Sequence, residues 1–316
     1  MPRLGPKIIS GRFSKGQRER RRSGINLEEA ALSDQTRSRY YIALNKLTPA
    51  LTGVRSLPHM DELCCDWIHK MWESGEPLLT VGDALSALHY FQPFTRRGIP
   101  HAWKLFSTWR KIEVPSRAPP LTEVLVRSMS AYELYHNRLE MATCLMLAFY
   151  ALLRTGELLS LTTEDVLLGK HAAVLSLQST KTSKRFAAHD AISLQDPFAL
   201  ELLGTLLEVR KSNRLYRLGI WSGTSQHFRN RFRRLTEIFG LQNHRFRPYS
   251  LRRGGATFLF QQSGSMELVL TKGRWESSKV AKMYISDALS YLPAIKLNKT
   301  TRSLLERFHY VSPTMG

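Results

Sequence analysis

The sequence is poor in cysteine and has no long apolar run. Its three cysteines, Cys64, Cys65 and Cys144, are odd in number and form no CxxC pair. This excludes a disulfide framework and a cysteine zinc site, and favours a reducing, intracellular compartment. The longest apolar run, residues 144–153, has ten residues and is too short to span a bilayer. The N-terminus is basic but has no apolar segment like that of a signal peptide.

Acidic residues are also scarce: 26 Asp and Glu stand against 46 Lys and Arg, a net charge of +20. So much positive charge repels itself unless a polyanion is near, so nucleic acid is the leading partner and an anionic membrane surface the weaker alternative. Two segments carry most of the excess. Residues 1–24 hold eight basic residues and one Glu, and residues 210–253 hold twelve and one Glu. We expect the first to be a disordered basic arm and the second to be a binding surface.

The chain is expected to be mainly α-helical and to divide into two domains. Residues 25–112 show helical spacing throughout, with Asn26 and Thr80 as possible N-caps. The helices expected there cover residues 26–51, 61–72, 80–94 and 101–112. Residues 113–121 hold three prolines and are predicted to be a linker.

The second domain, residues 122–316, is predicted to be mixed α/β, with helices around one small β-hairpin. Residues 172–179 and 186–194 have strand character and flank the polar segment TKTSKR. Residues 224–240 form an amphipathic pattern, with four bulky apolar side chains on one face and arginines on the others. The apolar four are Phe228, Phe232, Leu235 and Phe239.

Several residues of this domain have chemistry that suits an anionic substrate. Arg154 ends a nearly all-apolar segment predicted to be a helix, where a cation is favoured by the helix dipole. Glu157 follows at +3, on the same helical face, where it can hold the guanidinium. Tyr249 and Arg252 share a helical face in the same way. Lys181 lies in the expected hairpin turn, and Trp275 and Tyr284 follow Arg252 at +23 and then +9.

In this order and spacing the residues resemble the active site of the tyrosine recombinases, or phage integrases: Arg, Lys, (His or Tyr)-x-x-Arg, (His or Trp), Tyr. The resemblance covers about residues 122–285 and rests on LLRTGELLSL, STKTSKRF and YSLRRGGAT together with Trp275 and Tyr284. It implies a helical core-binding domain over residues 25–112 and a mixed α/β tyrosine-recombinase-like catalytic domain after the linker. It also implies that the two domains form a C-shaped clamp around double-stranded DNA and that the protein acts as a DNA-bound homo-tetramer.

The resemblance assigns each residue a role in attack by a tyrosine on a DNA phosphodiester. Arg154 and Arg252 would clamp the phosphate oxygens and stay charged at any working pH. Tyr249 and Trp275 would add neutral hydrogen-bond donors. Lys181 would protonate the leaving 5′ oxygen. Tyr284 would be the nucleophile and form a 3′-phosphotyrosine, so that religation needs no metal or other cofactor.

The match has departures. Position 249 is usually His in the family, and a Tyr is a poor general base. Arg253, Gly254 and Gly255 stand where His and two packing residues are common, and each glycine costs a helix roughly 1 kcal/mol. Lys184 competes with Lys181 for the acid role. The basic surface is expected to contact the DNA backbone through Arg229, Arg231, Arg233, Arg234, Arg245 and Arg247.

The leading hypothesis is therefore site-specific recombination or mobile-element DNA integration. One alternative is a domesticated DNA-binding protein that is catalytically weak, and another is a type IB topoisomerase-like relaxase. The Arg-rich run at residues 18–22 is either a nuclear import signal, a phosphate-binding arm or a solvated tail. The expected location is the nucleus in a eukaryote and otherwise the cytoplasm or nucleoid.

Overall fold

The computed structural model describes residues 31–114, 117–177, 190–213, 218–275 and 297–308, together with residues 277–279, 281, 282 and 285. The expected arm at 1–24, Asn26, the hairpin turn with Lys181 and Lys184, and Tyr284 lie outside them. The chain divides into two compact units, Met1–Ser116 and Arg117–Gly316, each with its own core. The division falls inside the segment 113–121.

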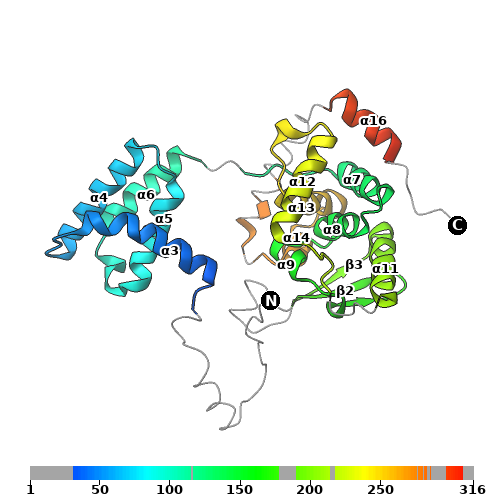
Figure 1. Cartoon of the computed structure of the whole chain (residues 1–316), viewed down its shortest axis with the longest axis horizontal. Helices are drawn as coiled ribbons and strands as arrows, with labels where there is room; N and C mark the ends of the chain where they lie inside the picture. The colour runs from blue at the N-terminus through cyan, green and yellow to red at the C-terminus, as the bar shows by residue number, and fades with distance from the viewer. Residues whose placement is uncertain are drawn as a thin grey trace, which may run out of the picture. The chain divides into compact units, whose positions relative to one another are not determined.

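The first unit holds four α-helices in its described residues (Figure 1): α3 (Asp34–Leu47), α4 (Leu57–Glu73), α5 (Leu78–Phe91) and α6 (Pro100–Ile112). Two short 3-10 turns, η1 (Thr48–Leu51) and η2 (Pro93–Arg97), join them. Helix α3 packs on α5 and α4 packs on α6 around a core that includes Leu47, Trp67, Leu85 and Trp109.

Side chains fix where these helices begin. Ser33 and Ser56 accept a backbone N–H at the starts of α3 and α4. Helix α6 is capped from another helix, because the buried Asp61 of α4 accepts the backbone N–H groups of His101 and Ala102. The expectation for α5 was wrong, since Pro77 is its N-cap residue and Thr80 lies within the helix.

The second unit begins with α7 (Glu123–Tyr135), α8 (Leu139–Tyr150) and the short α9 (Thr155–Ser160). After the 3-10 turn η3 (Thr163–Asp165) come β1 (Val166–Leu168), β2 (Ala173–Leu177) and β3 (Asp190–Leu194). The strands form one antiparallel sheet in the order β1-β2-β3, with Val166 opposite Leu175 and Ala173 opposite Leu194. The two expected strands are therefore present, and β1 was not predicted.

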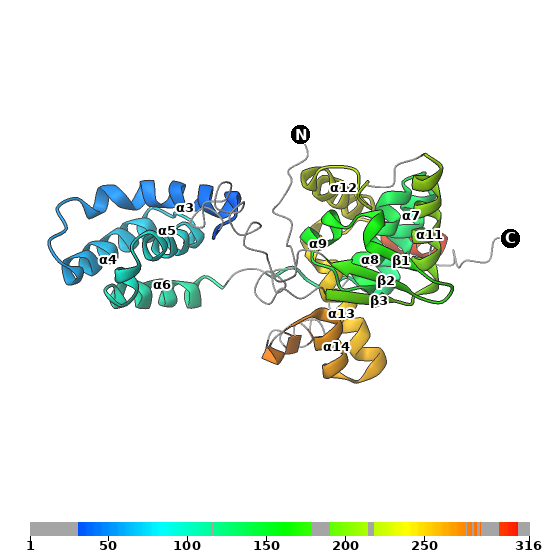
Figure 2. The ribbon, with the colours of Figure 1, turned by 90° about the horizontal axis from the view of Figure 1, so that it is seen from below.

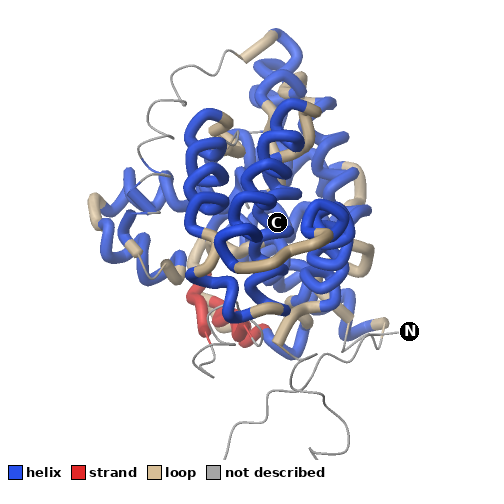
Figure 3. The backbone as a smooth tube through the Cα atoms, turned by 90° about the vertical axis from the view of Figure 1, so that its left-hand side faces the viewer, coloured by secondary structure: helices blue, strands red, loops and turns tan. Residues whose placement is uncertain are grey.

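The remaining elements in the described residues of this unit are helical: α11 (Pro197–Ser212), α12 (Ser225–Ile238), η4 (Gln242–His244), α13 (Tyr249–Ser263), α14 (Met266–Gly273) and α16 (Lys299–Phe308). Helix α8 is almost fully buried, and α7, α9, α11 and α13 pack on it. Figure 2 shows α13 and α14 side by side below the sheet. Helices dominate, with one small sheet (Figure 3), so the expected mainly helical fold class is confirmed.

The four apolar residues of the expected amphipathic helix are all buried, between 0% and 1% exposed. Three lie on the inner face of α12, and Phe239 is its C-cap residue. Helix α16 packs on α7 of its own chain, where Phe308 contacts the rings of Tyr132 and Tyr135. The Thr301 hydroxyl also donates to the Phe239 carbonyl. The described part of the C-terminal segment is therefore docked within the chain.

Candidate active site

The turn between α8 and α9 places Arg154. Leu152 has a φ of +48°, in the left-handed region that a branched side chain rarely adopts. Arg154 then stands as the N-cap residue of α9, with extended backbone. Its backbone N–H donates to Glu157 Oε2 over 2.8 Å, and its Nη1 donates to Glu157 Oε1 over 2.6 Å. The prediction that Arg154 ends the preceding helix is therefore wrong, because helix α8 ends at Tyr150 and Arg154 is the N-cap residue of helix α9.

Helix α13 carries Arg252 into the interior of the unit. Its side chain is 1% exposed, and its Nη1 and Nη2 donate to the carbonyls of Leu152 and Gly273. The guanidinium lies 4.5 Å from the ring centroid of Trp275, within cation–π range. Tyr249 begins the same helix and is half-buried, near enough to raise the pKa of Arg252 electrostatically.

The two glycines after Arg253 let α13 approach its neighbours closely. A Cβ at Gly254 would lie 1.9 Å from the Leu121 carbonyl oxygen, and one at Gly255 would lie 1.9 Å from the Phe149 carbonyl oxygen. Both contacts are with backbone atoms and so exclude any side chain. The glycines that weaken the helix in isolation are therefore what its packing requires.

A third arginine, which the sequence analysis did not single out, enters the same centre. Arg274 follows α14 with a φ of +54°. Its Nη2 donates to the Leu152 carbonyl over 3.0 Å and to Glu157 Oε2 over 2.8 Å. The preceding Gly273 has no space for a Cβ, which would lie 1.9 Å from the Trp275 ring. The signal in the sequence was one positive charge directly before Trp275, with nothing to show which way it points.

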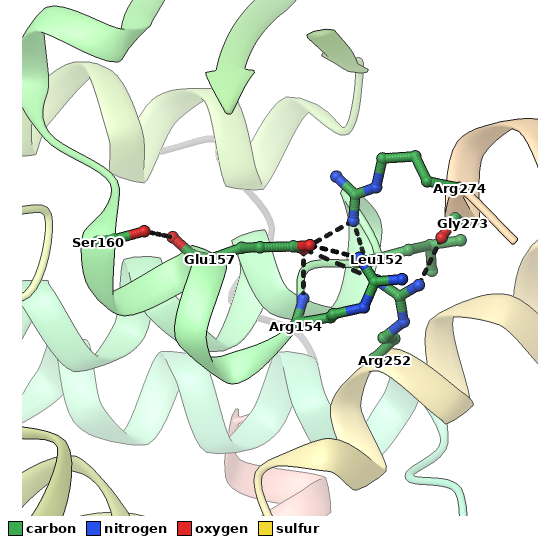
Figure 4. A network of polar contacts seen from close by, with 7 residues as sticks. All are labelled: Leu152, Arg154, Glu157, Ser160, Arg252, Gly273 and Arg274. Carbon is green, nitrogen blue, oxygen red and sulfur yellow. Dashed lines mark hydrogen bonds and ion pairs between the residues drawn. The ribbon is translucent and has the colours of Figure 1, made fainter. Parts of the chain in front are cut away.

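The three guanidinium groups come from separate segments and converge on Glu157 and the Leu152 carbonyl (Figure 4). Arg252 Nη1 lies 3.8 Å from Glu157 Oε2, and Glu157 is 6% exposed. Burial, together with the charges of Arg154 and Arg274, lowers the pKa of Arg252 to about 10. Burial also lowers the pKa of Arg274, which Glu157 partly opposes.

The structure brings together four of the predicted site residues, Arg154, Glu157, Arg252 and Trp275, with Tyr249 nearby. Lys181 and Tyr284 lie outside the described residues. Ile285, which follows Tyr284, is 4% exposed and belongs to a small apolar cluster with Leu152, Ala256 and Val269. Among the described residues no group of three or more His, Cys, Asp or Glu side chains is placed to hold a metal ion.

The predicted DNA-contacting arginines divide into two kinds. Arg231 forms an ion pair with two hydrogen bonds to Glu133, which is 0% exposed, so its charge compensates a buried carboxylate of the same unit. This ion pair argues against the predicted contact of Arg231 with the DNA backbone. The others are exposed: Arg229, Arg233, Arg234, Arg245 and Arg247.

A mainly helical unit with this sheet and a centre of clustered arginines has the fold of solved tyrosine recombinases. The model of the phage integrase family matches residues 122–290, more than half of the sequence, and the chain belongs to that family. It is therefore a tyrosine-type recombinase, an enzyme that breaks and rejoins DNA.

Three solved structures resemble the chain at low identity. The Tn1549 transposon integrase in complex with transposon right end DNA is 13% identical, with a TM-score of 0.58, covering 92% of this chain and 97% of that one. A lambda integrase dimer bound to a COC′ core site is 16% identical, with a TM-score of 0.54, covering 90% of this chain and 98% of that one. The XerH site-specific recombinase bound to difH is 15% identical, with a TM-score of 0.51, covering 82% of this chain and 79% of that one.

At these identities the likeness shows the fold. No curated protein sequence matches the chain significantly. In the described part of the chain, no helix is both long and apolar enough to cross a membrane.

Proposed function

We propose that the chain cleaves and rejoins double-stranded DNA at specific sites through a covalent bond between Tyr284 and a 3′ phosphate. The observation that carries this is the pair Arg154 and Arg252, which are 98 residues apart in sequence and share Glu157 as a neighbour. Two fixed guanidinium groups suit a phosphodiester whose oxygens gain negative charge in the transition state. Ile285, which directly follows the proposed nucleophile in the sequence, is buried beside Leu152 of the turn that carries Arg154.

The chemistry follows the roles set by residue type. The Tyr284 hydroxyl loses its proton to solvent as its oxygen attacks phosphorus, the bond to the 5′ oxygen breaks, and Lys181 gives that oxygen a proton. Arg154 and Arg252 hold the non-bridging oxygens, while Tyr249 and the Trp275 indole N–H donate further hydrogen bonds. The reverse attack by a 5′ hydroxyl restores the phosphodiester, so the bond energy is conserved.

DNA binding is proposed to use both units. The exposed arginines of α12 and of the segment before α13 supply backbone contacts in the catalytic domain, residues 122–316. The helical unit over residues 25–112 would act as the core-binding domain and the arm at 1–24 as an additional polyanion contact. For each phosphate that the protein neutralises, the logarithm of the DNA-binding constant K falls by about 0.9 for a tenfold rise in salt concentration. The DNA-bound structures of the XerH recombinase and of the Tn1549 and lambda integrases support a DNA-bound assembly for this chain. We propose that it is a tetramer, acting in the nucleus of a eukaryote and otherwise in the cytoplasm or nucleoid.

Covalent trapping tests the proposal. Purified full-length protein would be mixed with a nicked genomic library from its own host, so that cleavage releases a short fragment and the reaction cannot reverse. The attached DNA would be sequenced after denaturation. The expected result is adducts at one recurring sequence, lost in Tyr284→Phe and retained in the control Tyr291→Phe. Salt-sensitive binding without adducts would favour the domesticated binding protein, and sequence-independent plasmid relaxation would favour the relaxase.

A further inference from the structure

Two segments of the active site are held together by contacts that meet at Leu152 and Glu157. The first segment is the α8–α9 turn, which carries Arg154. The second is the turn after α14, which carries Arg274 and Trp275. Arg252 bridges them by donating to the Leu152 and Gly273 carbonyls, and Arg274 bridges them again by donating to the Leu152 carbonyl and to Glu157.

Glu157 could orient Arg154 only if its own carboxylate is fixed. Oε1 accepts the Arg154 side chain and Oε2 accepts both the Arg154 backbone N–H and Arg274 Nη2. Arg274 thus supplies a hydrogen bond to the carboxylate from outside the Glu157 turn, whereas Arg252 Nη1, also from outside that turn, lies farther from Oε2 at 3.8 Å. Its side chain is 9% exposed, and a charge this deeply buried is retained only where a partner compensates it.

The backbone of Arg274 supports the same conclusion. A left-handed conformation is unfavourable for a residue with a Cβ, and such strain persists where the surroundings determine it. Here the Arg274 and Trp275 N–H groups bond back to the Thr271 and Leu270 carbonyls. This conformation ends α14 and sends the Arg274 side chain into the centre, toward Leu152 and Glu157 (Figure 4).

We infer that Arg274 is a positioning residue for DNA cleavage: through Glu157 it fixes the orientation of Arg154, and through the Leu152 carbonyl it ties the Trp275 turn to the α8–α9 turn. The inference rests on the proposed function for its catalytic consequence. Its structural content concerns the free protein and is measurable without DNA.

The first test measures hydrogen exchange in the free full-length protein. The Arg154 amide donates to Glu157 Oε2, so loosening the carboxylate exposes that amide. Arg274→Gln is expected to speed exchange in peptides covering residues 153–158 at least tenfold, with α11 peptides unchanged. The control Arg302→Gln removes one exposed charge from α16 and should change neither. Unchanged exchange at residues 153–158 in Arg274→Gln overturns the inference, whether or not the protein cleaves DNA.

The second test uses single-turnover cleavage of the trapped site at saturating DNA. Arg274→Gln is expected to slow cleavage about 10- to 100-fold while DNA affinity stays within about threefold, and Arg274→Lys to recover part of the loss. Because Arg274 acts through Glu157, the Arg274→Gln/Glu157→Gln double variant should lose at least tenfold less than the product of the single losses.

Three outcomes of the second test would overturn the inference: an unchanged rate, a loss confined to affinity, or single losses that multiply. Multiplying losses would mean that Arg274 contacts the phosphate independently of Glu157. A thermal melt of each variant separates these outcomes from unfolding, and Arg274→Lys serves if Arg274→Gln does not fold. A wild-type protein that forms no adduct would refute the proposed function, leaving the exchange measurement to decide the inference.

Discussion

Replacing Gly255 by alanine tests the link between the packing of α13 and the position of Arg252. The added Cβ would lie 1.9 Å from the Phe149 carbonyl oxygen, whereas ordinary contacts begin at 3.4 Å, so α13 must shift from α8 by about 1.5 Å. Neither atom belongs to a side chain that can rotate away. Overpacking of this kind costs typically about 1–3 kcal/mol, and the better helix propensity of alanine returns up to about 1 kcal/mol.

The shift also moves Arg252, which lies one helical turn before Gly255 and bonds the Leu152 and Gly273 carbonyls. A misplacement of about 1 Å at a catalytic group can lower the rate about 10²-fold. Gly255→Ala is therefore expected to lower Tm by a few degrees and to slow cleavage about 100-fold. Differential scanning calorimetry and single-turnover cleavage below the new Tm measure the two effects.

Gly204→Ala is the matched control, because Gly204 lies inside α11 and its Cβ would meet its nearest atom, Leu168 Cδ2, at 3.4 Å. That variant should be more stable by about 0.5–1 kcal/mol and fully active. A Gly255→Ala protein with wild-type Tm and wild-type cleavage would refute the reasoning that α13 requires a glycine there to seat Arg252.

Three further predictions concern charge. Glu157→Gln removes a carboxylate that raises the pKa of Arg252, so this pKa should fall below its present value of about 10 and the alkaline loss of cleavage should move to lower pH; an unmoved alkaline limb in the pH–rate profile would contradict this. Arg231→Gln leaves the buried Glu133 unpaired and should lower the free energy of unfolding by about 3 kcal/mol in urea titrations, with an unchanged salt dependence of DNA binding. Arg233→Gln should do the opposite, keeping stability and lowering the slope of log K against log salt by about 1; equal behaviour of the two arginine variants would refute their division into interior and surface residues.

The sequence predicted features whose causes are local. The inner face of α12 follows from bulky apolar residues at helical spacing, such as Phe228 and Phe232, because burying them is the dominant stabilising term. The β2–β3 pairing follows from two apolar strands around a polar turn. The order and spacing of Arg154, Arg252 and Trp275 carried the family resemblance, and the structure brings these three residues together around Glu157 and the Arg252 guanidinium.

Features that depend on distant partners could not be predicted in this way. Arg231 looked like a surface charge because its partner, Glu133, lies 98 residues earlier. The break before Arg154 follows from a left-handed Leu152, a conformation that leucine rarely adopts and that the apolar run concealed. Arg274 was missed because only the folded turn after α14 directs its side chain into the centre.

The most direct test of the account is the identity of the residue that becomes linked to DNA. After trapping on the nicked site, the complex would be digested with protease and nuclease, and the modified peptide sequenced by mass spectrometry. The account predicts a nucleotide on the Tyr284 oxygen, in the wild type and in Tyr291→Phe, with no adduct in Tyr284→Phe. A nucleotide on any other residue, or an adduct that persists in Tyr284→Phe, would contradict it.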